Sequence, residues 1–356
     1  MVNDIEQVAV LIPAYNPDEK LVTYVGELLA ADFMQIIVVD DGSRKECEQY
    51  FEQIEQEHEV TVLHHKENQG KGRALKTGFT YCLEHFPDCV GVVTADSDGQ
   101  HSVKDTVRVA QKLQENPDQM ILGTRNFDEP GVPFKSKSGN KITTVVFALL
   151  HGAYLRDTQT GLRGIGKRYL EECCSLQGER FEYEINMLVY AAHHKIPFKE
   201  VLIETIYIDD NKETHFRPFQ DSMKIYGVIL RTFFQYLFSS LSASLIDLGV
   251  FTICNMVLFT SLQTGKNVLY STIVARILSS LYNFIMNQRV VFRSHGNVVR
   301  KAMRYYALVV VQMALSAGLV FLFVHLLSCI ALPVKVVVDT VLFLISFQIQ
   351  KRFVFV

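Results

Sequence analysis

The chain has 356 residues, 49% of them hydrophobic, and a formal net charge of −3. This length exceeds that of a typical single domain, so we expect two domains. The charge is uneven: the residues after Arg231 include ten Lys and Arg but only two Asp, a net charge of +8, which leaves about −11 on the first part. An acidic first part argues against nucleic-acid binding. Seven scattered cysteines without a CxxC pair argue against a zinc site or thioredoxin-like chemistry.

Short apolar stretches alternate with helical stretches in the first 115 residues. We expect strands at residues 8–12, 35–39, 60–64 and 90–94. Helices are expected at residues 18–30, 44–57, 72–85 and 103–114. Alternation of this kind predicts an α/β fold, a parallel sheet covered by helices on both faces.

A polar cluster follows each of the four expected strands. The clusters are Pro13-Ala14-Tyr15, Asp40-Asp41-Gly42-Ser43, the Gly-rich turn 68–74 and the acidic run 96–101. Each cluster alone is also what an ordinary turn looks like. Four clusters in order instead indicate a ligand site, because ligands of such sheets gather at the carboxyl ends of the strands. The Gly-rich turn carries Lys71 and opens a helix, which suits a diphosphate.

The acidic run contains the strongest single signal. Asp96 and Asp98 lie two residues apart, and Gln100 follows at the same spacing. These oxygen donors suit Mg²⁺ or Mn²⁺. The run therefore predicts a divalent metal that serves a phosphorylated ligand.

The four clusters together resemble the motif series of family 2 glycosyltransferases, and most closely that of the polyprenyl- and dolichyl-phosphate sugar transferases. The resemblance covers about the first 215 residues. It implies a GT-A fold (a Rossmann-like mixed sheet), a nucleotide-sugar donor and a divalent metal. By position, the nucleotide-sugar contacts would come from Pro13, Ala14, Tyr15, Asp41, Lys71 and Asp96. The metal ligands would be Asp96, Asp98 and Gln100.

Later motifs extend the resemblance to the acceptor side. Gly123-Thr124-Arg125 is similar to the family's Gly-Ser/Thr-Arg, and residues 157–163 resemble its Asp-x-x-(Ser/Thr)-Gly-x-Arg. The stretch 126–140 has no helical period, so we expect a loop there. The acceptor phosphate would be held by Arg125, Lys137, Arg163 and Arg217. Glu182 and Glu184 open a helix, where either a role in the site or simple helix-end charges are expected.

The mechanism expected from this resemblance depends on charge. A lipid phosphate is already an anion, so it needs alignment behind the anomeric carbon rather than a general base. Asp157 then orients its neighbours, although a base role remains open. A single in-line displacement predicts inversion at the anomeric carbon.

Four long apolar segments follow from residue 233. They span about residues 233–260, 268–291, 305–330 and 332–350, each near or above the length that crosses a bilayer. The preceding segment, 216–232, mixes basic and apolar residues as an interfacial helix does. We therefore expect a cytosolic domain at 1–215 and a membrane domain of four helices at 233–356. Basic residues gather between the second and third spans and at the chain end, which places both termini in the cytosol.

The membrane domain carries a weak internal repeat. Residues 283–292 resemble residues 346–355 at an offset of 63. This pattern is similar to that of GtrA-type four-span domains, a resemblance that also allows for a homo-oligomer.

Three functions compete. We expect transfer of a hexose from a nucleotide sugar to polyprenyl (undecaprenyl) phosphate at the cytosolic leaflet, for cell-envelope glycans or protein glycosylation. UDP-glucose is the preferred donor and GDP-mannose the alternative. A translocase of lipid-linked sugars is the second reading. A processive polysaccharide synthase is disfavoured, because its Gln-x-x-Arg-Trp motif needs a Trp and the chain has none.

Overall fold

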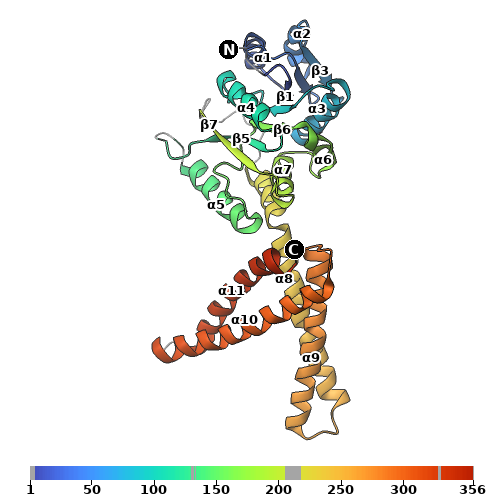
Figure 1. The fold of residues 1–356 in the computed structure, drawn as a ribbon, viewed down its shortest axis with the longest axis vertical. Coiled ribbons are helices and arrows are strands. Elements are labelled where there is room, and N and C mark those ends of the chain that lie inside the picture. The colour runs from blue at the N-terminus through green and yellow to red at the C-terminus, as the bar shows by residue number, and fades with distance from the viewer. Residues whose placement is uncertain (1–4, 130–131, 133, 205–217, 328–329, 356) are drawn as a thin grey trace. The chain divides into compact units, whose positions relative to one another are not determined.

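A computed structural model describes all residues except 1–4, 130–131, 133, 205–217, 328–329 and 356. The chain divides into two compact units, Met1–Ile229 and Leu230–Val356 (Figure 1). Each unit is described by itself below.

The first unit is built on a seven-stranded sheet with the order β3-β2-β1-β4-β6-β5-β7. Only β6 runs antiparallel to its neighbours among these strands. The sheet is therefore mixed, as a GT-A fold requires. The strands are β1 Val8–Ala14, β2 Ile36–Asp40, β3 Val60–His64, β4 Gly91–Thr94, β5 Met120–Arg125, β6 Arg163–Gly166 and β7 Phe198–Ile203.

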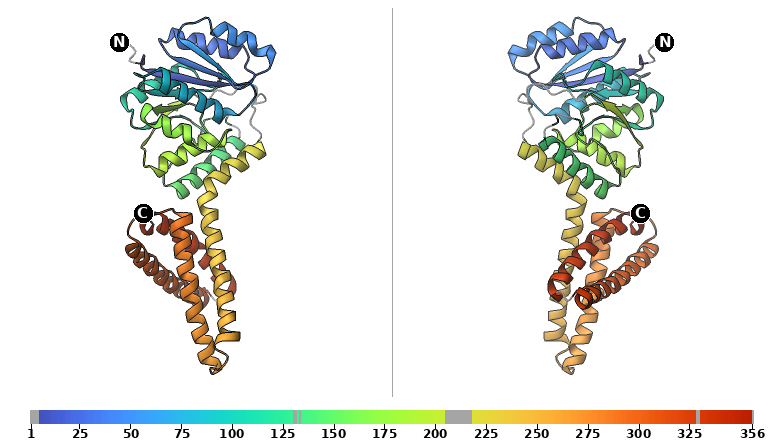
Figure 2. Two further views of the ribbon diagram at one scale, coloured as in Figure 1. Left: turned by 90° about the vertical axis from the view of Figure 1, so that its right-hand side faces the viewer. Right: turned by 90° about the vertical axis from the view of Figure 1, so that its left-hand side faces the viewer.

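Helices cover both faces of this sheet (Figure 2). Alternate residues of β1 point to opposite faces, so Leu11 packs in one core while Val10 and Ile12 pack in the other. The Val10 core includes residues of α1 Glu19–Ala30, α2 Glu48–Ile54 and α4 Val103–Glu115. The Leu11 core includes residues of α3 Lys71–His85, α5 Phe134–His151, α6 Leu170–Ser175 and α7 Glu182–His193.

Two expected elements differ from the structure. The expected helix at 44–57 is shorter, a 3₁₀ turn at Lys45–Cys47 followed by α2. The expected loop at 126–140 is wrong in its second half, because α5 begins at Phe134. The polar first turns of α5 carry no helical period, but Val146 and Phe147 in its later turns pack into the core. Tertiary packing of the later turns therefore decides the helix.

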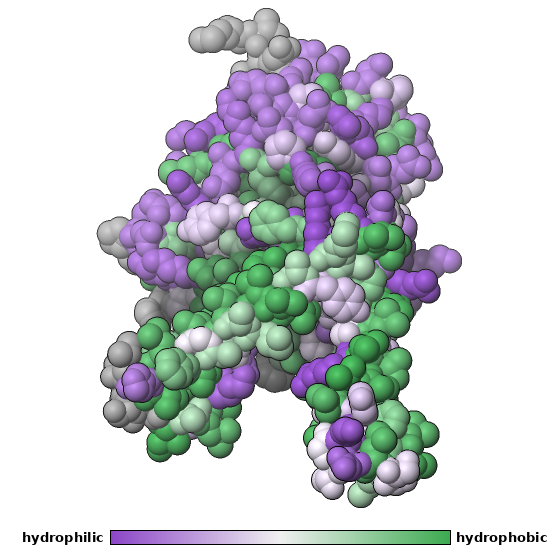
Figure 3. All heavy atoms as spheres, turned by 60° about the horizontal axis from the view of Figure 1, so that its bottom comes forward, coloured by the Kyte–Doolittle hydropathy of each residue, from purple (hydrophilic) through white to green (hydrophobic). Residues whose placement is uncertain are grey.

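The second unit consists of long helices with apolar surfaces (Figure 3). Among the described residues, four helices are long and apolar enough to cross a membrane, as the sequence predicts. They are α8 Pro218–Ile253, α9 Thr264–Met286, α10 Val298–Leu327 and α11 Ala331–Ile349. Residues 218–232, expected as a separate interfacial segment, form the first turns of α8 without a break. Residues 216–217 lie outside the described part.

The internal repeat has a counterpart in the backbone. α9 ends in a π-helical turn at Asn287–Val291, and α11 ends in one at Gln350–Val354. These turns are 63 residues apart, the offset of the sequence repeat. Asn287 Nδ2 donates a hydrogen bond of 3.0 Å to Gln350 Oε1, so the two equivalent side chains meet in the interior of the unit.

Candidate active site

The predicted site residues gather at one edge of the sheet. β1, β2, β4 and β5 are parallel, so their carboxyl ends meet there, and antiparallel β6 begins at the same edge. Thr94 pairs with Arg163 in this register. The edge therefore collects the turns that the sequence singled out.

A cluster of partly buried charges forms the centre of this edge. Lys71, the first residue of α3, lies with its Nζ 2.6 Å from Asp96 Oδ1. The same Nζ is 3.0 Å from Glu184 Oε2 on α7. His101 Nε2 lies 3.4 Å from the other Asp96 oxygen. One lysine thus links the turn after β4 to α7.

These charges support one another against burial. Burial alone would lower the pKa of Lys71, but Asp96 and Glu184 overcome it and raise that pKa above its ordinary value. Burial likewise opposes the Asp96 carboxylate, but Lys71 and His101 hold its pKa well below the usual range. Burial and the charge of Asp96 raise the pKa of Asp98. No ion pair reaches Asp98 from the part of the chain that the structure describes.

Gly161 permits the close packing around Asp96. A Cβ at this position would lie 2.2 Å from Asp96 Oδ2. The hydroxyl of Thr94 donates to the Gly161 carbonyl at 2.8 Å and fixes the turn against β4. Only glycine lets the backbone before β6 approach this carboxylate so closely.

Asp96, Asp98 and Gln100 form a donor set that fits a hard divalent cation. Two carboxylates and a carboxamide offer oxygen ligands, and burial together with the charge of Asp96 raises the pKa of Asp98. Within the described ranges, no three His, Cys, Asp or Glu side chains converge as a complete metal cage. The set suits a cation that takes its other ligands from a diphosphate.

Asp41 follows β2, as expected, and is engaged within the protein. Its carboxylate is buried and accepts hydrogen bonds from the backbone N–H groups of Gln69 at 2.9 Å and Gly70 at 2.7 Å. It also contacts His65 Nδ1 at 2.8 Å. In the structure Asp41 therefore holds the Gly-rich turn that leads to Lys71, and both of its oxygens are used within the protein.

The other expected nucleoside residues lie at the end of β1. Pro13 and Ala14 are the last residues of this strand and are buried, whereas Tyr15 is half-buried just beyond it. The Ala14 carbonyl accepts from the Asp41 N–H at 2.8 Å. The turns after β1 and β2 are thus tied together at the site edge.

Arg125 and Asp157 form a paired unit. Arg125 Nε donates to Asp157 Oδ2 at 2.7 Å and Nη2 donates to Oδ1 at 3.2 Å. Asp157 is fully buried, while the Arg125 side chain is 26% exposed and lies over the Phe127 ring. A bidentate pair of this kind fixes the guanidinium plane.

Arg163 does not reach the surface. The residue is fully buried, and its guanidinium donates to the backbone carbonyls of Thr160 and Glu184. Burial lowers its pKa. In this geometry the Arg163 side chain joins β6 to α7 through backbone carbonyls.

Of the two remaining acceptor-side residues, the structure describes Lys137. Lys137 Nζ pairs with Asp128 at 2.9 Å on the exposed side of α5. Arg217 lies outside the described residues.

Four residues have contacts in the structure that the sequence did not assign. Glu184, left open between two roles, binds Lys71, while Glu182 accepts from the backbone N–H groups of Glu179 and Arg180 at the helix start. His101 is buried beside Asp96, and His65 contacts Asp41. His101 is the last residue of the acidic run 96–101 and could have been predicted as a site residue from that position. Nothing in the sequence marks His65.

Comparisons with known proteins agree with this architecture. The family model described as glycosyl transferase family 2 matches residues 9–175, and the GtrA/DPMS transmembrane domain matches residues 235–355. The chain is 31% identical over 216 residues to a UDP-N-acetylglucosamine–dolichyl-phosphate N-acetylglucosaminyltransferase of Methanococcus voltae, covering 56% of this chain and 85% of that protein. It is 27% identical over 257 residues to a dolichyl-phosphate beta-glucosyltransferase of Dictyostelium discoideum, covering 64% and 74%.

A solved structure shares the fold of the first part. Glucosyl-3-phosphoglycerate synthase of Mycobacterium tuberculosis, in complex with Mn²⁺, UDP and glucosyl-3-phosphoglycerate, aligns with a TM-score of 0.50 at 14% identity, over 65% of this chain and 83% of that one. The four apolar helices and the matching membrane-domain model make the protein an integral membrane protein. The chain is thus a glycosyltransferase that belongs to glycosyl transferase family 2 and carries a C-terminal GtrA/DPMS transmembrane domain.

Proposed function

We propose that this glycosyltransferase moves a hexose from a nucleotide sugar to a polyprenyl phosphate such as undecaprenyl phosphate. The observation that carries the proposal is the Lys71–Asp96–Glu184 cluster beside Asp98, in a chain that also has four membrane-crossing helices. The cluster suits a diphosphate donor, and the helices suit a lipid acceptor. Two relatives are named for transfer to dolichyl phosphate, which supports the same acceptor class here.

The donor side depends on the acidic turn after β4. Asp96, Asp98 and Gln100 would hold Mg²⁺ or Mn²⁺ through oxygen atoms. A bound divalent cation would neutralise charge that develops on the leaving diphosphate. Lys71 supplies a second, permanent cation 2.6 Å from Asp96, where it can bind a phosphate oxygen. Pro13, Ala14 and Tyr15 line the nucleoside end.

The acceptor side depends on Arg125. Its guanidinium is partly exposed, and buried Asp157 fixes its plane. An arginine held this way can bind the acceptor phosphate and aim its oxygen at the anomeric carbon. Asp157 then acts as a positioning residue, because Arg125 engages both of its oxygens. Lys137 and Arg217 remain proposed contacts of the same phosphate.

The stereochemistry follows from a single displacement. The anionic oxygen of the lipid phosphate attacks the anomeric carbon, and the bond to the nucleoside diphosphate breaks. No covalent intermediate on the protein is involved, so the product has the inverted anomeric configuration. Because nucleotide sugars are cytosolic, the reaction is placed at the cytosolic leaflet.

A donor panel tests the proposal. Purified full-length protein in detergent is incubated with undecaprenyl phosphate and radiolabelled UDP-glucose, UDP-N-acetylglucosamine, UDP-galactose or GDP-mannose, with and without EDTA. We expect labelled lipid from UDP-glucose, and loss of the label with EDTA. If only another donor labels the lipid, that donor replaces UDP-glucose in the proposal. Lipid-linked sugar movement in vesicles, with no transfer from any donor, would instead support a translocase.

A further inference from the structure

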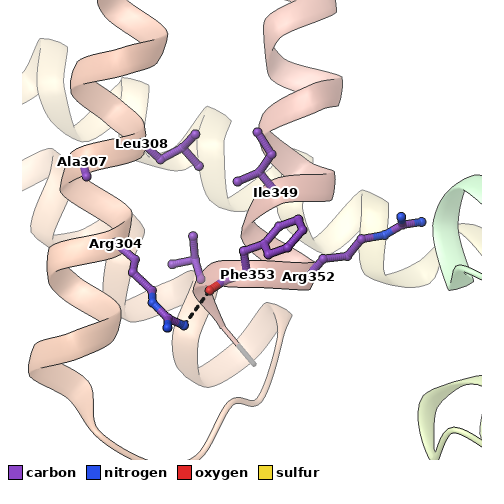
Figure 4. A pocket seen from close by; sticks show the side chains of 7 residues that line it. Arg304, Ala307, Leu308, Ile349, Arg352 and Phe353 are labelled. Atoms are coloured by element: carbon purple, nitrogen blue, oxygen red, sulfur yellow. Dashed lines mark hydrogen bonds between the residues drawn. The ribbon is translucent and has the colours of Figure 1, made fainter.

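Cations stand in different arrangements in the two units. In the open pocket between the start of α10 and the π-helical turn after α11, Figure 4 shows Arg352 pointing away from Arg304, whose Nη1 donates to the Phe353 carbonyl at 2.8 Å. At the turn after β4, Lys71 Nζ instead lies 2.6 Å from Asp96 Oδ1. The cation at this turn therefore has a defined anionic partner.

Both carboxylate oxygens of Asp96 have close neighbours in the structure. Lys71 Nζ lies at Oδ1, and His101 Nε2 lies 3.4 Å from Oδ2. The backbone also closes on Oδ2, since a Cβ on Gly161 would lie 2.2 Å from it. A divalent cation that binds Asp96 must therefore displace a neighbour, and the flexible Lys71 side chain is the one that rotation can remove.

Lys71 already supplies positive charge at the place where a metal ion would supply it. Its Nζ also lies 3.0 Å from Glu184 Oε2, and the carboxylates of Asp96 and Glu184 raise the pKa of Lys71 above its ordinary value, so the side chain stays an ammonium group. Like charges a few ångströms apart repel strongly where water is partly excluded. The chain by itself therefore disfavours a metal ion at Asp96.

We propose that Lys71 takes the place of the metal at Asp96 in the donor-free protein, so that a divalent cation binds there tightly only together with a nucleoside diphosphate. This inference rests on the proposed function and adds the order in which the site is filled. The phosphates of the nucleotide offer Lys71 another anionic partner, through charge-assisted hydrogen bonds. When Nζ moves from Asp96 to a phosphate oxygen, Asp96 Oδ1 becomes available to the cation.

Binding of Mn²⁺ alone to the purified full-length protein tests the proposal. The EPR signal of free Mn²⁺ measures this binding without nucleotide, in about 0.5 M KCl, where salt screens long-range charge effects. K71M keeps a long side chain but removes the cation. We expect K71M to bind Mn²⁺ at least about fivefold more tightly than the native chain, the lower end of the usual coupling between two ligands. K71R keeps a cation and should bind Mn²⁺ as weakly as the native chain.

Two control variants assign the gain in affinity to this site. K112M removes a lysine from the last turn of α4, where it pairs with Glu115, and should leave Mn²⁺ binding unchanged. The double variant K71M/D98N should lose the gain, because Asp98 is one of the proposed metal ligands. A tighter Mn²⁺ site cannot arise from misfolding, so K71M stays informative even if it is less stable.

Nucleotide binding separates this inference from the proposed function. Calorimetry with UDP and with GDP, each in Mn²⁺ and in EDTA, shows whether nucleotide binding uses a metal. If it does, equal Mn²⁺ affinities of K71M and the native chain would overturn the inference and leave the proposed function standing. A gain in K71R as large as that in K71M would do the same. If Mn²⁺ affects neither nucleotide, both the inference and the proposed metal site are wrong.

Discussion

At the scale of single residues, Gly161 sets how closely the backbone can approach Asp96. An added methyl group would lie 2.2 Å from Asp96 Oδ2, so the carboxylate must move. We expect G161A to lower the transfer rate by about 10- to 100-fold, because small misplacements at a site cost this much. The measurement is kcat/KM for lipid-linked sugar formation.

Gly139 offers a matched control for this substitution. It lies in α5, and an added Cβ would meet nothing within 4 Å. G139A should retain full activity and be slightly more stable, since alanine favours helix. Equal activity of G161A and the native chain would show that the Asp96 contact is unimportant.

Asp98 is the residue that should respond most to loss of charge. D98N keeps the side-chain shape but removes a carboxylate from the proposed metal set. We expect transfer to fall by about 100-fold or more, with weaker dependence on added Mn²⁺. The control D88N changes an exposed aspartate outside the site and should leave activity unchanged. Near-native turnover by D98N would contradict the metal assignment.

The sequence revealed which residue types lie at the site but not how the protein uses them. Asp96 follows the end of β4 and Lys71 opens the helix that follows β3, so their proximity could be foreseen. Arg163 and Asp41 could not be placed this way, because their roles depend on backbone groups that the fold brings to them. A sequence motif shows a guanidinium or a carboxylate, but it does not show which carbonyl or N–H already occupies it.

At the scale of elements, strand positions were more predictable than strand direction. Apolar runs located β1 to β4 within two residues of their observed ends. The antiparallel course of β6 carries no local signal, since Arg163–Gly166 is a four-residue segment. The start of α5 was missed because packing of its apolar later turns, not local periodicity, stabilises it.

The contact between the two membrane repeats gives a prediction at this scale. Asn287 and Gln350 are buried, and Gln350 Nε2 also donates to the Tyr236 hydroxyl at 3.0 Å. A double-mutant cycle with N287A and Q350A should give a coupling energy of about 0.6 kcal/mol, the usual size for such bonds in membranes. The coupling energy is obtained from the free energies of unfolding in SDS of the full-length native chain and its three variants.

Two exposed residues of α8 supply the control cycle. Within the described residues, the hydroxyls of Ser244 and Thr252 each donate only to a carbonyl four residues earlier in the same helix. The effects of S244A and T252A on the free energy of unfolding should therefore be additive. Additive effects of N287A and Q350A as well would argue against a coupled pair at the repeat junction.

At the scale of the whole molecule, basic residues predict the orientation in the membrane. Arg293 lies between α9 and α10, and Arg300 and Lys301 lie in the first turn of α10. The basic residues at the opposite ends of the helices are Lys266 and Lys335, near the starts of α9 and α11. We expect both termini in the cytosol. A fluorescent protein fused to either terminus should fluoresce in bacterial cells, and alkaline phosphatase should be active only when inserted between α8 and α9 or between α10 and α11. An active phosphatase fused to the C-terminus would show that this terminus lies outside the cytosol and would contradict the predicted orientation.

The two units together define the central claim, that a nucleotide-sugar site serves a lipid phosphate. The most direct measurement compares undecaprenyl phosphate with undecaprenol as acceptors for the full-length protein and its preferred labelled donor. The account predicts labelled lipid with undecaprenyl phosphate and none with undecaprenol, because the phosphate oxygen is the nucleophile. Equal labelling of both lipids, or donor hydrolysis without labelled lipid, would contradict it.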